Sequence, residues 1–355
     1  MKKNHNLYSN LALNLAWTHL GKTKKNPSVG CVIVKNNSVI SSGVTSINGR
    51  PHAEFNALNK KINFKGSDMY VTLEPCTHYG LTPPCTSIIK KKKINKVFYT
   101  FEDPDLRTYN KAKKILSKSK IKLKKIKLKD NNLYKSYYLN KNKYFPLIDA
   151  KLAISKDYYT INKNSKWITN YRSRKVGHLL RSKYDSIIST SASINKDNSL
   201  LNCRIEGLNN YQPDLIIIDR NLKLKKNLKL FKLLSKRKTF VVTMGNNKKK
   251  LSFLKNKKLK IIKINKLIDK DDFEKLFKKI FKEGKRRILL EVGLIFLNKL
   301  LRFNLINDLY LFKSKVFLRN KGYNNSNINL IKKLKFKKKI NVNLQQDELY
   351  KIRIK

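Results

Sequence analysis

Four residues in the first hundred have the types and spacing of one catalytic site. His52 and Glu54 lie two positions apart in "PHAE", and Cys76 and Cys85 lie nine positions apart in "EPCTHYGLTPPC". One imidazole and two thiolates form a common ligand set for a catalytic zinc ion, which keeps its fourth position open for water. Zinc lowers the pKa of this water towards neutrality. A carboxylate beside the ligands can then move a proton from the water to a departing amine, as in zinc deaminases. The pattern predicts His52, Cys76 and Cys85 as zinc ligands and Glu54 as the proton carrier.

A structural zinc site is the alternative interpretation, and it would need a fourth protein ligand. His78 lies between the two cysteines and could supply it, although the same position also suits a substrate contact. Carboxylates are scarce in this part of the chain, where Glu54, Asp68 and Glu74 are the only acidic residues among the first hundred. A structural site gives no reason for Glu54 to lie so close to His52, so we favour the catalytic interpretation.

The composition raises the question of a nucleic-acid partner. The chain has 81 Lys and Arg residues against 23 Asp and Glu, a formal net charge of +58. The basic residues are spread over runs at 90–93, 120–129, 222–238 and 246–260, which favours a general compositional bias over a dedicated nucleic-acid partner. Such a charge would still attract phosphorylated substrates. We expect a cytoplasmic protein, because four scattered cysteines indicate no disulfide framework and no apolar run is typical of a signal peptide or a membrane span.

Helices and strands are predicted to alternate along the chain, which is typical of α/β domains. In the first part we expect helices at 11–20, 51–60, 85–92 and 109–118, and strands at 29–34, 39–40, 67–73, 96–100 and 121–129. The polar and aromatic stretch 134–146 is a candidate boundary. In the second part we expect helices at 171–183 and 271–284, and strands at 147–154, 186–190, 215–219, 239–243, 258–264, 286–292 and 305–312. No G-x-G-x-x-G occurs, so a Rossmann dinucleotide site has no sequence support.

Several segments together resemble one enzyme family. "NPSVGCVIV" (26–34), "PHAE" (51–54), "TLEPCTHYGLTPPC" (72–85) and "EDPD" (102–105) are similar to the bifunctional riboflavin-biosynthesis deaminase/reductase family, whose zinc motif has the same long spacing between the cysteines. In the second half "DAKLAIS", "KWIT", "HLLRSKYDSIISTSASI", "LIIIDRNLKL" and "LLEVG" follow in the family's order. The resemblance implies a cytidine-deaminase-like three-layer α/β/α domain at 1–145, followed by a dihydrofolate-reductase-like α/β domain at 146–355.

The resemblance also implies two successive reactions on a phosphorylated pyrimidine. The first domain would use zinc to deaminate 2,5-diamino-6-(5-phosphoribosylamino)pyrimidin-4(3H)-one. The second would use NADPH to reduce the ribosyl group of 5-amino-6-(5-phosphoribosylamino)uracil to ribityl. A homo-oligomer is implied as well, whereas it is the composition that indicates neither a dedicated nucleic-acid partner nor a membrane partner. The positions where the family contacts substrate are Ser165, Arg181, Leu201, Arg204 and Glu291, and those where it contacts the nicotinamide cofactor are Ala153, Trp167, Ser193, Asp197, Arg220 and the turn starting at Gly293.

Departures from the family pattern concentrate in the second half. The motif S-x-D-G-[RK] is replaced by a segment with Tyr158 and Tyr159, and we expect this turn to differ because a tyrosine adopts a glycine's positive φ at a cost. Further departures are Asn198 and Ser199 after Asp197, Leu294 after Gly293, and a shorter segment before Trp167. An active deaminase with a degenerate reductase half therefore stays open as an alternative. The net charge of +58 leaves two others open: a zinc deaminase acting on nucleic acid, and a non-catalytic, basic nucleic-acid-binding protein with a structural zinc.

Overall fold

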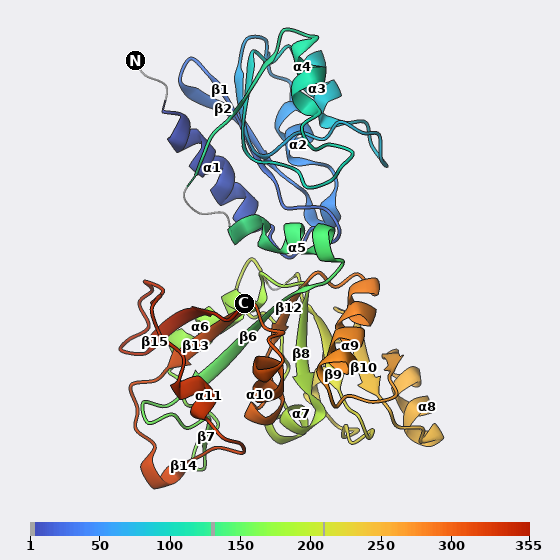
Figure 1. Ribbon diagram of the computed structural model, residues 1–355, viewed down its shortest axis with the longest axis vertical. Helices are drawn as coiled ribbons and strands as arrows, with labels where there is room; N and C mark the ends of the chain where they lie inside the picture. Colours follow the sequence, from blue (N-terminus) through green and yellow to red (C-terminus); the bar gives the residue numbers. More distant parts are fainter. Residues whose placement is uncertain (1–3, 129–131, 209) are drawn as a thin grey trace. The chain divides into compact units, whose positions relative to one another are not determined.

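The computed structural model describes residues 4–128, 132–208 and 210–355. The chain divides into two compact units, Met1–Phe145 and Pro146–Lys355, which are described separately (Figure 1). Across these three ranges, no helix is both long enough and apolar enough to cross a membrane.

The first unit is built on a five-stranded sheet in the order β2-β1-β3-β4-β5. Strand β1 pairs antiparallel with both β2 and β3, whereas β3, β4 and β5 are parallel. The strand bounds are Gly30–Lys35 (β1), Ser38–Val44 (β2), Asp68–Leu73 (β3), Lys96–Phe101 (β4) and Lys122–Lys125 (β5). All the strands predicted for this unit form, although the one predicted at 121–129, whose last residue lies outside the described ranges, is observed only at Lys122–Lys125.

Helices cover both faces of this sheet because side chains alternate along β1. Val32 and Val34 pack in one cluster with α1 (His5–Thr18), whereas Cys31 and Ile33 pack in a second cluster with α2 (Ala53–Leu58). The close approach of α1 depends on Gly30, because a Cβ atom there would lie 1.9 Å from the carbonyl oxygen of Ala12. The other helices are α3 (Cys85–Lys91), α4 (Ala112–Ser117) and α5 (Lys135–Lys143). Helix α5 occupies the stretch that the sequence indicated only as a boundary.

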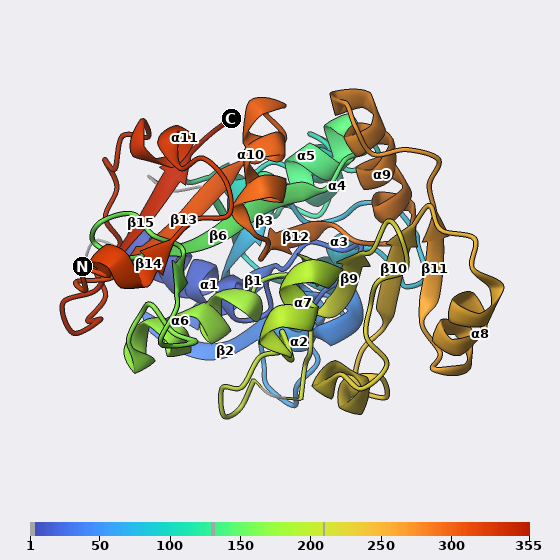
Figure 2. The ribbon, with the colours of Figure 1, turned by 90° about the horizontal axis from the view of Figure 1, so that it is seen from below.

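The second unit contains an eight-stranded sheet in the order β11-β10-β9-β8-β12-β6-β13-β15 (Figure 2). All neighbouring strands are parallel except β13 and β15, which are antiparallel. The bounds are Leu147–Ile154 (β6), Ser186–Thr190 (β8), Asp214–Ile218 (β9), Thr239–Thr243 (β10), Lys260–Lys263 (β11), Arg287–Leu290 (β12), Asp308–Lys313 (β13) and Glu348–Arg353 (β15). A separate small pair joins β7 (Ile161–Asn162) to β14 (Gly322–Tyr323).

Helices lie on both sides of this sheet, with α9 and α10 on one side and α6 and α7 on the other (Figure 2). Helix α9 begins at a capping box formed by Asp269 and Asp272, and its apolar side contributes Phe273, Leu276 and Phe277 to the core. The helix bounds are Tyr171–Arg181 (α6), Ser191–Asp197 (α7), Lys248–Asn256 (α8), Lys270–Lys282 (α9), Leu294–Arg302 (α10) and Asn329–Lys332 (α11).

The turn after β6 corrects one expectation. Tyr158 has a φ of 69°, so a tyrosine adopts the left-handed conformation that we expected this turn to avoid. Its ring accounts for the tolerance, because it stacks on Phe336 at 6.5 Å and lies under the ammonium of Lys313 at 4.9 Å. The amide of Asn324 also donates to the carbonyl of Tyr158 at 3.0 Å. Side-chain packing therefore offsets the backbone cost.

Candidate active sites

Three predicted zinc ligands come together at one end of the first unit's sheet. His52 is the N-cap of α2, Cys76 follows β3, and Cys85 is the first residue of α3. Nδ1 of His52 lies 3.7 Å from Sγ of Cys76 and 3.4 Å from Sγ of Cys85, and the ligand atoms of all three residues lie within 4.8 Å of one another. Tetrahedral zinc with ordinary Zn–N and Zn–S bonds places such atoms about 3.6 Å apart. The donor set and its spacing therefore fit a zinc ion.

His78 does not join this cluster. Over the residues that the structure describes, the cluster holds His52, Cys76 and Cys85 alone. The Nδ1 atom of His78 instead lies 3.2 Å from Oγ1 of Thr108. A three-ligand site leaves a fourth position for water, as a catalytic site requires.

Glu54 lies in the first turn of α2, two residues after His52, and is only 4% exposed. Burial raises the pKa of Glu54 to about 7. A carboxyl group with a pKa near the working pH can both accept and donate a proton. Within the cluster, a hydrogen bond with Cys85 lowers the pKa of Cys76 to about 4, which favours the thiolate that binds metal. The geometry therefore combines a metal site with a group that can shuttle protons.

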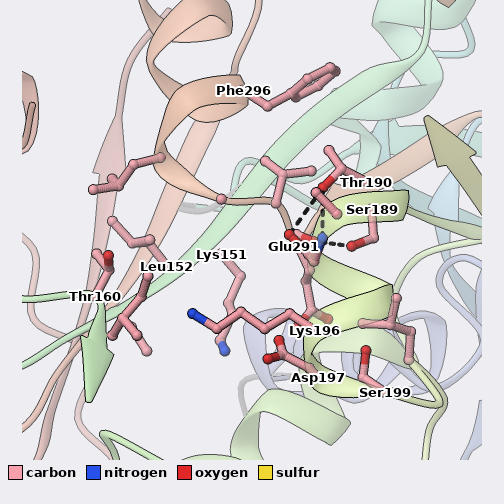
Figure 3. A pocket seen from close by; sticks show the side chains of 18 of the residues that line it. Lys151, Leu152, Thr160, Ser189, Thr190, Lys196, Asp197, Ser199, Glu291 and Phe296 are labelled. Carbon is pink, nitrogen blue, oxygen red and sulfur yellow. Dashed lines mark hydrogen bonds between the residues drawn. The ribbon is translucent and has the colours of Figure 1, made fainter. Parts of the chain in front are cut away.

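The second unit contains a cavity of about 1060 Å³. It opens where β6, β8, β9 and β12 end, and Figure 3 shows Thr190, the last residue of β8, and Glu291, which follows β12, together with Lys196 and Asp197 of α7. Ligands of open parallel sheets commonly bind outside the carboxyl ends of the strands. The residues expected to contact substrate or cofactor all line this cavity, namely Ala153, Ser165, Trp167, Arg181, Ser193, Asp197, Leu201, Arg204, Arg220, Glu291 and Gly293.

Arg181 and Glu291 form an ion pair inside this cavity. The guanidinium donates to both carboxylate oxygens, at 2.5 and 2.9 Å, and also to the carbonyl oxygen of Asn202 at 2.9 Å. Burial alone would raise the pKa of Glu291, but the charge and hydrogen bonds of Arg181 outweigh it and lower this pKa to about 2. Arg204 donates to the side-chain oxygen of Asn202 at 2.7 Å. Arg181 is therefore held by Glu291. If Arg181 and Arg204 bound a substrate phosphate together, the pair of Arg181 and Glu291 would have to rearrange.

Three of the six expected cofactor positions lie at the start of a helix or in an exposed segment. Ser193 hydrogen-bonds to the Thr190 side chain that caps α7, and Gly293 is the N-cap of α10. Trp167 is 50% exposed, and the guanidinium of Arg174 lies 4.7 Å from its ring centroid. Exposed aromatic surface and a helix start are features that a flat ring or a phosphate group can use.

Lys151 is a cavity residue that the sequence reasoning missed. It lies on β6, two positions before Ala153, and lines the cavity (Figure 3). Burial lowers the pKa of Lys151, while the negative charge of Glu291 acts against this shift. A single lysine within the apolar run "LIDAKLAI" is the signal that could have revealed it, because a central parallel strand rarely buries a charge without purpose.

Comparisons with known proteins match both units. The cytidine and deoxycytidylate deaminase zinc-binding region matches residues 2–101, and the RibD C-terminal domain matches residues 146–338. The riboflavin biosynthesis protein RibD of Buchnera aphidicola subsp. Baizongia pistaciae is 32% identical over 358 residues, which cover 93% of this chain and 94% of the relative. RibD of Aquifex aeolicus is 37% identical over 185 residues, and that alignment spans about half of each chain.

Solved structures agree with this assignment. RibD of Acinetobacter baumannii has a TM-score of 0.83 at 26% identity, with 98% of each chain covered. The deaminase/reductase of Thermotoga maritima has a TM-score of 0.81 at 24% identity, covers 98% of this chain and 99% of its own, and supports the fold. These matches confirm the predicted fold class of two α/β domains. The chain belongs to the RibD family of riboflavin biosynthesis proteins, which join a zinc-dependent deaminase domain to a reductase domain.

Proposed function

We propose that this chain catalyses two consecutive steps of riboflavin biosynthesis. Residues 1–145 would deaminate 2,5-diamino-6-(5-phosphoribosylamino)pyrimidin-4(3H)-one, and residues 146–355 would reduce the ribosyl group of the deaminated product to ribityl. The observation that carries the proposal is the three-ligand cluster with buried Glu54 beside it, in a chain that aligns with RibD over 93% of its length. These findings do not favour a nucleic-acid deaminase or a non-catalytic binding protein.

In the deaminase site, His52, Cys76 and Cys85 would hold zinc, which when bound supplies a water molecule that ionises near neutral pH. A neighbouring side chain also orients His52. The amide of Asn26 lies 3.5 Å from Nε2 of His52, on the far side of the ring from Nδ1, and so favours the ring orientation in which Nδ1 faces the cysteines. Glu54 would hold the proton taken from water and pass it to the leaving amine.

In the reductase site, NADPH would supply the hydride, and the cavity residues would position it against the substrate. Reduction also requires a proton, and Lys151 is the cavity side chain that we assign to supply it. The negative charge of Glu291 favours the protonated, positively charged form of Lys151. Arg204 and the exposed lysines around the cavity would attract the substrate phosphate. The departures at Asn198 and Leu294 lie in this same lining, so the reductase step needs its own test.

The test gives zinc-loaded protein the undeaminated pyrimidine together with NADPH and follows NADPH absorbance and ammonia in one tube. Loss of absorbance that depends on the pyrimidine, with one ammonia per NADPH, supports both steps. Ammonia without NADPH loss would assign only the first step to this chain. The absence of both signals would overturn the proposal. A Glu54→Gln protein that still releases ammonia at the wild-type rate would refute the mechanism given for the first unit.

We also propose that the protein acts in the cytoplasm, as its sequence composition suggests, and that it forms a homo-oligomer, as the family resemblance implies. Light scattering at several protein concentrations measures the oligomeric state, and a monomer at all of them would contradict this part of the proposal.

A further inference from the structure

A series of hydrogen bonds connects the zinc loop, residues 74–85, to a segment that follows β4. This segment, residues 102–112, is called the support segment below. Three side chains of the zinc loop hydrogen-bond to it: Glu74 accepts from the N–H groups of Asn110 and Ala112 at 3.2 and 3.3 Å, Thr77 donates to the carbonyl of Arg107 at 2.8 Å, and His78 pairs with Thr108 at 3.2 Å. Glu74 is 3% exposed and Thr108 is fully buried. The zinc loop is therefore held from the side by the support segment.

Helix α5 holds the support segment in turn. Three of its side chains reach the first residues of the segment: the Tyr137 hydroxyl donates to Oδ1 of Asp103 at 2.9 Å, the Tyr138 hydroxyl donates to the carbonyl of Glu102 at 2.8 Å, and the Lys141 ammonium lies 2.7 Å from Oδ2 of Asp105. We call Tyr137, Tyr138 and Lys141 the α5 clamp.

The two carboxylates that contact the α5 clamp are largely shielded from water. Asp103 is 5% exposed and Asp105 is 9% exposed. A buried carboxylate that loses a donor must find another or move towards water. The main chain of Asp105 donates to Asp103 at 2.9 Å, and Arg107 donates to both oxygens of Asp105. Movement at these two residues would therefore pass to Arg107 and from there to Thr77 of the zinc loop.

The arrangement resembles the outer support of known metal sites, in which groups that do not touch the metal fix the residues that do. The match to the deaminase zinc-binding region ends at residue 101, so neither the support segment nor the α5 clamp belongs to that matched region. We propose that Tyr137, Tyr138 and Lys141 are positioning residues of the deaminase site. The proposal rests on the proposed deaminase function, because it assigns these side chains to the same zinc loop.

The first measurement is the rate at which zinc-loaded, full-length protein releases zinc to a chromogenic chelator. Tyr137→Phe and Lys141→Met are each expected to speed release about tenfold, the lower end of the effect of lost outer-shell contacts. Tyr144→Phe is the matched control, because it makes the same chemical change at an exposed tyrosine that ends α5. Lys141→Arg keeps the ion pair with Asp105 and is expected to release zinc at the wild-type rate.

The second measurement is steady-state ammonia release, with the reductase step measured separately on the deaminated pyrimidine. The proposal predicts that kcat/KM for ammonia falls about tenfold in Tyr137→Phe, while NADPH oxidation is unchanged. Wild-type zinc release in both Tyr137→Phe and Lys141→Met would overturn the proposal, as would an equal loss of both activities, which indicates general destabilisation. A wild-type protein that releases no ammonia would refute the proposed function, yet zinc release would still decide the role of the α5 clamp.

Discussion

The ion pair between Arg181 and Glu291 allows a quantitative prediction for the substitution Glu291→Gln. The side chains are 15% and 11% exposed, and two hydrogen bonds join them. Arg181 contributes to lowering the pKa of Glu291 from 4.5 to about 2, and this difference corresponds to about 3 kcal/mol of folding free energy at neutral pH. Glutamine keeps the shape but leaves Arg181 without its counter-charge, which independently predicts a loss of about 3 to 5 kcal/mol. We therefore expect the second unit to lose about 3 kcal/mol.

Urea unfolding at pH 7 measures this loss. Trp17 and Trp167 are the two tryptophans of the chain, one in each unit, so a Trp17→Phe background makes the fluorescence of Trp167 report on the second unit. Because the pKa of Glu291 is lowered in the folded state, its contribution is complete above about pH 4.5 and disappears as the pH falls towards 2. Lys266→Met is the control, since the pair between Lys266 and Asp269 is exposed to solvent and is expected to contribute little to stability. A loss below about 1 kcal/mol for Glu291→Gln would refute the reasoning.

Three further predictions concern both units. Glu54→Gln is expected to lower ammonia release by about 10² to 10⁴ while zinc content by elemental analysis is unchanged, because the substitution removes only the proton carrier; loss of zinc would contradict this. Gly30→Ala is expected to destabilise the first unit by more than about 2 kcal/mol in thermal unfolding, because the new methyl group meets the backbone of Ala12 at 1.9 Å; a wild-type melting temperature would be the opposite result. Burial lowers the pKa of His178 to about 4, so the unfolded chain binds more protons between about pH 6.5 and 4 and stability falls as the pH falls through that range. Between pH 7 and pH 5 the free energy of unfolding is expected to fall by about 1 to 2 kcal/mol less in His178→Gln than in the wild type, as measured by urea titration. An identical pH dependence in wild type and variant would contradict the lowered pKa of His178.

The sequence predicts those elements best whose apolar pattern is continuous. The strand expected at 239–243 matches β10 in both bounds, because a parallel strand between two neighbours is buried on both faces and favours a run of apolar and β-branched residues. Strand β15 was not predicted, since its segment "ELYKIR" resembles the lysine-rich sequence around it and becomes a strand only by pairing with β13. Helix α5 was also missed, because its aromatic residues bind a neighbouring segment rather than form a periodic apolar face.

The candidate sites show the same division. The metal cluster was predictable because four residues of three chemically specialised types, His52, Glu54, Cys76 and Cys85, occur at characteristic spacings. The pair of Arg181 and Glu291 was not, because 110 residues separate its members and no local pattern links them. The turn at Tyr158 was wrongly predicted for a related reason, since the ring that compensates its φ packs on Phe336 far along the chain.

The outermost strands of the two sheets give the lysine bias a consequence for self-association. Strand β5 ends the first sheet with Lys122, Lys124 and Lys125, and β11 ends the second with Lys260 and Lys263. An uncovered outer strand offers free backbone groups to which a strand of another molecule can add, and lysines on it oppose such addition. Salt at 1 M shortens the screening length to about 3 Å, so this repulsion between lysines becomes weak. The same charge that protects the folded chain in dilute buffer would then cease to prevent fibrous aggregation.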